Sequence, residues 1–251
     1  MHKLLAALYS ALVYVLFLGV FLYAIGFVEN TLVPKSIDSG TSGSVAGSLL
    51  TDAALLVLFA VQHSVMARPG FKRIWTRVVP WEFERSTFVL FASLALALVC
   101  WQWRPLPQSV WSIEDPIAAK ALVVVSWSGW GLLLLSTFFI SHFHLFGLSQ
   151  GFARLLGNKL PEPEFVAPFL YRWLRHPIYA GFIIAFWATP RMSLGHLFFA
   201  VATTGYIFVG IWLEERDLVA YFGDRYRQYR ATVGMLVPKI RLASARKRVA
   251  H

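Results

Sequence analysis

The chain has 251 residues, of which 57% are hydrophobic and 14% charged, whereas soluble globular domains average roughly 45 to 50% apolar and about 25% charged residues. The composition therefore argues against a soluble globular domain. The single cysteine, Cys100, excludes an intramolecular disulfide and any metal cluster built from cysteines. The net charge of +10 suits either nucleic-acid binding or a preferred orientation in a membrane. The positions of the charges have to decide between the two.

The first half of the chain predicts four membrane-spanning helices. Residues 4–28 contain no charged side chain, and a helix of this length crosses a hydrocarbon core of about 30 Å. The run exceeds the apolar region of a signal peptide, about 7 to 15 residues, and no cleavage site of the A-x-A kind follows, so we expect it to remain in the mature protein. Further apolar stretches predict helices at about 49–67, 86–103 and 117–141.

Residues 178–213 predict a helical hairpin. Arg191 is the one charged residue in this stretch and stands beside Pro190, which indicates two helices joined by a tight turn at 188–195. The first arm has only about 12 residues, so we expect it to cross obliquely or to lean on neighbouring helices. An even number of crossings places both termini on one side of the membrane.

The distribution of basic residues supports this topology, because Lys and Arg accumulate in cytoplasmic loops. Of the 23 basic residues, the predicted crossings place all on the side of the termini except Lys35, Arg104, Lys120 and Arg191. Both termini are therefore expected in the cytoplasm, and the positive charge needs no nucleic acid. Neither β-strand alternation nor a phosphate-binding loop is visible. Residues 39–48 predict a flexible external loop and residues 241–251 a basic tail, which leaves residues 1–240 as one all-α polytopic membrane bundle.

Polar residues concentrate at the cytoplasmic ends of the hairpin. The run R-H-P-I-Y-A-G at 175–181 precedes the first arm, Glu214 and Glu215 end the second, and F-G-D-R-Y-R-Q-Y follows at 222–229. Because a hairpin brings its two ends together, we expect these residues to share one pocket. The start of the first arm would also offer unpaired N–H groups to an anion. The alternative is that Arg175 anchors the helix at the interface and the two glutamates pair with Arg216 or Arg225.

This pattern of R-H-P-x-Y-x-G, E-E-x-x-L, F-G-x-x-Y-x-x-Y and V-P resembles the C-terminal signature of integral-membrane methyltransferases, which include isoprenylcysteine carboxyl methyltransferase and phospholipid methyltransferases. The resemblance covers residues 172–238 and implies a C-terminal helical hairpin with a cytoplasmic pocket for S-adenosylmethionine. In this pocket Glu214 or Glu215 would contact the ammonium and sulfonium groups of the cofactor. Arg175 or backbone N–H groups would bind its carboxylate. We expect the cofactor-binding residues to be Arg175, His176, Tyr179, Gly181, Glu214, Glu215 and Tyr229 and, outside this stretch, Gln150.

A narrower resemblance covers nearly the whole chain. The runs Q-H-S-V-M-A-R at 62–68, E-R at 84–85 and H-F-H-L-F-G-L-S-Q at 142–150, together with the N-terminal segment, resemble the bacterial methanethiol S-methyltransferases, which are relatives of the nuclear-envelope protein nurim. Membership implies methyl transfer from S-adenosylmethionine to methanethiol, with release of dimethyl sulfide, by an enzyme of the bacterial inner membrane. The bilayer and a small thiol are then the expected partners.

Methylation of sulfur requires alignment, exclusion of water and a thiolate nucleophile. A thiol is mostly protonated near neutral pH, so a neutral imidazole or a phenolate beside it can accept its proton. His144, His63 and Tyr179 are the expected catalytic residues. We expect His142, two positions from His144, to point elsewhere and to lie at the interface. Tyr226 and Tyr229 share a helical face and would be suited to stacking on adenine.

Four alternatives stay open at this point. In the first, the protein is a methyltransferase whose methyl acceptor is another thiol or a lipid. In the second, it is a non-enzymatic structural membrane protein like nurim. A sterol-reductase-like enzyme that uses NADPH has a related terminal motif, but few basic groups are available here for the nucleotide phosphates. A haem or di-iron site would use His63, His142, His144 and His176, although one H-x-H is sparse for such a site. We predict no metal site, no bound nucleic acid, and no role for His2, His196 or His251.

Overall fold

The computed structural model describes residues 2–158, 160 and 164–239. Its elements, in chain order, are α1 (His2–Val28), α2 (Val45–Ala67), α3 (Pro69–Trp75), α4 (Trp81–Gln102), β1 (Ser109–Ser112), α5 (Pro116–Ile140), α6 (His142–Leu145), α7 (Leu148–Leu156), the 3-10 helix η1 (Phe169–Arg172), α8 (Pro177–Trp187), β2 (Arg191–Ser193), α9 (Leu194–Phe222) and α10 (Asp224–Thr232).

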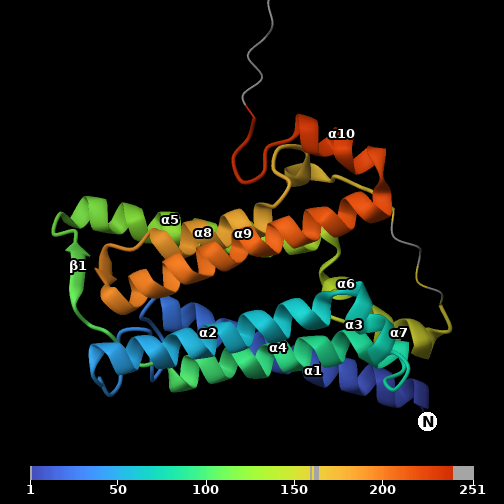
Figure 1. The fold of residues 1–251 in the computed structure, drawn as a ribbon, viewed down its shortest axis with the longest axis horizontal. Coiled ribbons are helices and arrows are strands. Elements are labelled where there is room, and N and C mark those ends of the chain that lie inside the picture. The colour runs from blue at the N-terminus through green and yellow to red at the C-terminus, as the bar shows by residue number, and fades with distance from the viewer. Residues whose placement is uncertain (1, 159, 161–163, 240–251) are drawn as a thin grey trace, which may run out of the picture.

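Five helices, α1, α2, α4, α5 and α9, are long and apolar enough to cross a membrane, and α8 is a shorter apolar helix. The long helices run roughly side by side in two layers, one made of α1, α2 and α4 and the other of α5, α8 and α9 (Figure 1). Many of their large apolar side chains are exposed on the outer surface, as expected where lipid replaces water. The predicted polytopic helical membrane protein is confirmed at this level.

The two layers are joined by aromatic packing and by one half-buried carboxylate. Phe27 and Trp103 from one layer pack with Trp130, Phe186 and Phe199 from the other in a single core cluster. At the end of α1, one oxygen of Glu29 accepts hydrogen bonds from Ser126 at 2.6 Å and from Trp130 Nε1 at 2.7 Å. Because a polar group in an apolar core is costly unless it is hydrogen-bonded, these bonds fix α1 against α5.

Helix boundaries differ from the predicted ones where polar residues continue or cap a helix. The second helix begins at Val45, inside the stretch expected to be a loop, because Ser44 caps it by accepting a hydrogen bond from the N–H of Gly47. α4 begins at Trp81 with acidic residues in its first turn, where they interact favourably with the helix dipole. α9 does not end near residue 213 but continues to Phe222, so Glu214 and Glu215 lie within the helix.

A short antiparallel ribbon, β1 with β2, corrects the expectation of an all-helical chain with a simple turn at 188–195. Trp111 pairs with Met192 and Ser112 with Arg191. Strands of three and four residues are too short to show an alternating pattern in the sequence, which is why the ribbon could not be predicted. It ties the turn between α8 and α9 to the connection between α4 and α5.

The ribbon and the start of α2 lie at one end of the bundle, and the start of α1, α3, α6, α7 and α10 lie at the other (Figure 1). Lys35, Arg104, Lys120 and Arg191 belong to segments at the ribbon end. The other end carries the remaining basic residues of the described chain, as the topology predicted. The expected basic tail, residues 241–251, lies outside the described residues.

Candidate active site

The C-terminal segment folds back over the start of α8. Leu174 and Gly234 form a parallel bridge, and the backbone N–H groups of Arg175 and His176 donate to the carbonyls of Gly234 and Met235 at 2.8 and 3.1 Å. A Cβ on Gly234 would lie 1.8 Å from the carbonyl oxygen of Val237, so no other residue fits at this turn without a backbone shift. The hairpin ends and the last described residues therefore form one structure.

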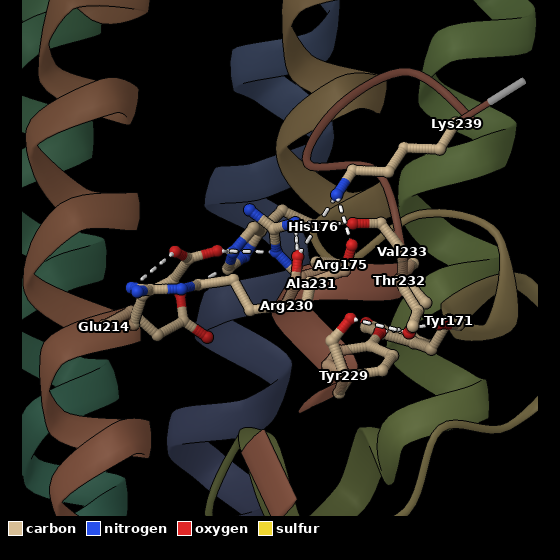
Figure 2. Close-up of polar contacts among 11 residues, drawn as sticks. Tyr171, Arg175, His176, Glu214, Tyr229, Arg230, Ala231, Thr232, Val233 and Lys239 are labelled. Atoms are coloured by element: carbon tan, nitrogen blue, oxygen red, sulfur yellow. Dashed lines mark hydrogen bonds and ion pairs between the residues drawn. The ribbon is translucent and has the colours of Figure 1, made fainter. Parts of the chain in front are cut away.

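Glu215 is the centre of a buried ion cluster at this place (Figure 2). Its Oε1 accepts from Arg175 Nε at 2.7 Å and lies 3.1 Å from His176 Nε2, and its Oε2 lies 3.7 Å from Arg230 Nη1. Arg175 also donates through Nη1 to the carbonyls of Arg230 and Val233. Glu215 and Arg175 thus hold the start of α8 together with α9 and α10.

Glu214, the neighbouring carboxylate, is exposed to solvent. Its side chain is 42% exposed, compared with 11% for Glu215. One oxygen accepts a hydrogen bond from Tyr179 Oη at 3.0 Å and lies 3.9 Å from His176 Nδ1. His176 therefore lies between the two glutamates, and Glu214 is the carboxylate that remains accessible to a cationic ligand.

The start of α8 lacks a side-chain cap. His176 occupies the N-cap position without making a side-chain cap, and Pro177 begins the helix. Pro177 has no N–H, and the amides of Ile178 and Tyr179 lie in the first turn, where a helix has no acceptors of its own for them. An open hollow of about 260 Å³ adjoins the cluster and is lined by Trp212, Glu215, Arg216, Val219 and Arg230. The hollow therefore borders Glu215 and Arg230 of the ion cluster.

The tyrosine pair predicted to stack on adenine is packed against the protein itself. Tyr226 is buried, and the ring of Phe165 lies 5.9 Å from that of Tyr226 and 5.1 Å from that of Tyr229. Tyr229 Oη donates to the carbonyl of Tyr171 at 2.5 Å. Burial raises the pKa of Tyr229 to about 12, with Arg175 opposing and Glu215 reinforcing the shift. Tyr229 is therefore a neutral donor that fixes the connection before α8.

The remaining predicted residues gather in a second polar cluster between α2, α4 and the α6–α7 corner. Gln150 donates to the carbonyl of His144 at 3.3 Å, and its Oε1 is buried without a partner. His63 stacks on Phe59. At the centre lies Arg85, whose Nε donates to the carbonyl of Leu145 at 2.7 Å. We did not predict a role for Arg85, although a cation inside an apolar helix was the signal that marked it.

Arg68 connects the two clusters. It forms an ion pair with Asp217 of α9 at 2.8 Å and donates to the carbonyl of Ser64. One turn further along, the hydroxyls of Ser64 and Tyr206 lie 3.0 Å apart. These contacts hold α2 against α9, with His63 on one side and Tyr179 on the other within electrostatic reach of Arg68.

Two predicted residues lie away from both clusters. A Cβ on Gly181 would be 2.6 Å from the carbonyl oxygen of Gly129, so Gly181 lies where α8 approaches α5 most closely, and its contact with a cofactor stays a prediction. His142 is not an interface residue. It is buried, and its two ring nitrogens hydrogen-bond Tyr14 and Thr137, both at 2.8 Å. Within the described residues, no group of three or more His, Cys, Asp or Glu side chains is arranged to hold a metal ion.

Fold and site together define a polytopic helical membrane protein with a polar, mixed-charge site at one end of its bundle. The chain is 56% identical to methanethiol S-methyltransferase 1 of Bradyrhizobium diazoefficiens, over 94% of this chain and 83% of that protein. It is 50% identical to methanethiol S-methyltransferase of Mycobacterium tuberculosis, over 95% of this chain and 98% of the relative. The chain belongs to the methanethiol S-methyltransferase family.

A more distant relative is nurim of Rattus norvegicus, which is 32% identical over 70% of each chain. No family model matches the chain. No solved structure matches it either.

Proposed function

We propose that this protein transfers a methyl group from S-adenosylmethionine to methanethiol and releases dimethyl sulfide. The observation that carries the proposal is the open carboxylate of Glu214 beside the uncapped start of α8, in a chain whose relatives are named for this reaction. S-adenosylmethionine has an ammonium, a sulfonium and a carboxylate group. A site with an accessible anion next to free helix N–H groups fits all three.

The two glutamates take different parts in this site. Glu214 meets the positive charges of the cofactor, and the first-turn amides of α8 meet its carboxylate. Arg175, His176 and Glu215 form the frame that holds the helix start and Glu214 in place. Tyr179 fixes the Glu214 carboxylate by donating to it. When bound, S-adenosylmethionine supplies an electrophilic methyl group on a sulfonium sulfur.

The bundle end that carries this site faces the cytoplasm of a bacterial inner membrane in our proposal. The four basic residues of the ribbon end are far outnumbered by those around α3, α8 and α10, and basic loops stay on the cytoplasmic side. This orientation gives the site access to a water-soluble cofactor, while a small apolar thiol reaches it from lipid or water.

The acceptor must lose its proton to become nucleophilic, and His63, His144 and Tyr179 are the candidate acceptors for it. Tyr179 already donates its proton in a hydrogen bond to Glu214, which favours the neutral phenol. The exposed His144 is close to Arg85 and Lys72, and desolvation together with these two charges lowers its pKa. A neutral imidazole near pH 7 is suited to accept a proton.

The cofactor site is tested by titrating purified protein in detergent with S-adenosylmethionine. Glu214→Gln removes the accessible charge and should weaken binding by about a hundredfold, on the scale of one charge-assisted interaction of roughly 1.5 to 3 kcal/mol. Asp224→Asn is the matched control, because its side chain at the same end is 83% exposed. Unchanged affinity of the Glu214→Gln variant for S-adenosylmethionine would contradict the assignment of Glu214 to the cofactor site. Binding of NADPH in place of S-adenosylmethionine would favour the reductase alternative.

A further inference from the structure

Arg85 is a cation inside a membrane helix without a carboxylate partner among the described residues. Arg175 pairs with Glu215 and Arg68 with Asp217. Glu84, next to Arg85, lies 3.7 Å from Lys72 and acts on Arg85 electrostatically without forming an ion pair with it. The recorded hydrogen bond of Arg85 uses Nε and a backbone carbonyl, which carries no full charge. A buried cation without an ion pair is costly, and a charged side chain in a membrane helix is a candidate functional residue.

His63 presents an unused ring nitrogen at the same place. Its Nδ1 is buried and makes no hydrogen bond. The ring stacks on Phe59, with centroids 5.4 Å apart, and lies 5.0 Å from the ring of Phe88. A buried imidazole nitrogen without a partner is destabilising, so a ligand that donates a proton to it would relieve this cost.

Phe88 brings the cation and the imidazole together. The guanidinium carbon of Arg85 lies 4.8 Å from the centroid of the Phe88 ring, and the His63 ring contacts the same ring. The surroundings thus combine one positive charge, one proton acceptor and apolar walls from Phe59 and Phe88. A small apolar thiol matches this set of groups. Its S–H would face the imidazole, the thiolate sulfur would face the guanidinium, and the methyl group would pack against the phenyl rings.

We infer that Arg85 and His63 form the binding site of the methyl acceptor and hold it as a thiolate against Phe88. The inference rests on the proposed methyltransferase function and assigns its substrate site. The S–H bond breaks, the proton moves to Nδ1 of His63, and the electron pair stays on sulfur beside Arg85. That pair then forms the new bond to the methyl carbon of the donor, whose own carbon–sulfur bond breaks to leave S-adenosylhomocysteine, and His63 returns its proton to water.

Arg68 relates this acceptor site to the donor site. Arg68 acts on His63 electrostatically and forms an ion pair with Asp217 of α9. It also acts electrostatically on Tyr179, which donates a hydrogen bond to Glu214. Acceptor and donor sites therefore approach one another across the contact between α2 and α9. The charged groups that act on His63 are Arg85 on α4 and Arg68, the C-cap residue of its own helix. Tyr206 on α9 contacts Phe59, on which the His63 ring stacks.

The test is a calorimetric titration of the full-length protein, saturated with S-adenosylhomocysteine, with methanethiol at pH 7 in two buffers of different ionisation enthalpy. In the unaltered protein the proton moves from sulfur to His63, so binding should release no proton to buffer. His63→Gln should bind about tenfold more weakly and release a proton. Arg85→Met should weaken methanethiol binding by about a hundredfold, and Arg85→Lys by less, since the charge remains.

Arg77→Met serves as the control, because Arg77 is an exposed cation at the same end and should leave methanethiol binding unchanged. The affinity for S-adenosylhomocysteine must stay within about twofold in every variant, which shows that each is folded and that the cofactor site is intact. If Arg85→Met weakens cofactor binding instead, Arg85 belongs to the donor site and the inference fails. Unchanged methanethiol binding in both the Arg85→Met and His63→Gln variants would equally overturn it, while leaving the proposed function standing.

Discussion

At the scale of single residues, the site depends on a difference between two neighbouring glutamates. The sequence predicted that both lie near Arg175 and His176, and the structure places both there. It could not tell which carboxylate is free, because adjacent helical residues point in directions about 100° apart and their partners come from α8 and α10. Arg85 escaped prediction for a similar reason: whether a cation is paired depends on contacts that only the folded chain defines.

His142 gives a residue-scale prediction of pH dependence. Burial lowers the pKa of His142 below its ordinary value, which is about 6.5, so the folded state favours the neutral ring. The stabilising contribution is therefore complete above about pH 6.5 and is lost as the pH falls through the unfolded value towards the folded one. The thermal midpoint should drop between pH 7 and pH 5, and it should drop less in His142→Gln. An identical drop in both proteins would show that His142 does not titrate on unfolding.

At the scale of elements, the sequence predicted the apolar helices well, because an uncharged stretch long enough to cross lipid has few alternatives. Their ends were predicted less well. Helix α9 runs past its apolar part to Phe222, where the backbone of Gly223 turns away at φ 59°. The polar residues of its last turns are stabilised by partners on α2, α8 and α10, so hydropathy alone gave no reason to extend the helix.

The contact between α5 and α8 yields a prediction for these elements. Gly129 and Gly181 let the two backbones approach so closely that a Cβ on Gly181 would lie 2.6 Å from a carbonyl oxygen. Gly181→Ala should therefore destabilise the protein by about 1 to 3 kcal/mol, as overpacking does. The control is Gly205→Ala on α9, where a Cβ would meet nothing within 4 Å and alanine favours the helix. Equal thermal midpoints for the two variants would contradict this account of the contact.

At the scale of the whole molecule, α6 and α7, which border one polar cluster, and α10, which borders the other, lie at the same end of the bundle (Figure 1). The layer of α8 and α9 carries Glu214 and the helix start proposed for the methyl donor. The layer of α2 and α4 carries His63 and Arg85, proposed for the thiol. Methyl transfer needs both partners aligned and shielded from water, and the ion pair between Arg68 and Asp217 joins the two layers at this end.

The central claim is tested most directly by headspace gas chromatography of membranes that contain the protein, supplied with S-adenosylmethionine and methanethiol. We predict dimethyl sulfide from the unaltered protein and a loss of at least about a hundredfold in its rate of formation with Glu214→Gln, whereas Asp224→Asn should match the unaltered protein. No dimethyl sulfide from membranes in which the protein is folded and binds S-adenosylmethionine would contradict methanethiol as the acceptor. Equal product from the unaltered protein and Glu214→Gln would contradict the proposed donor site.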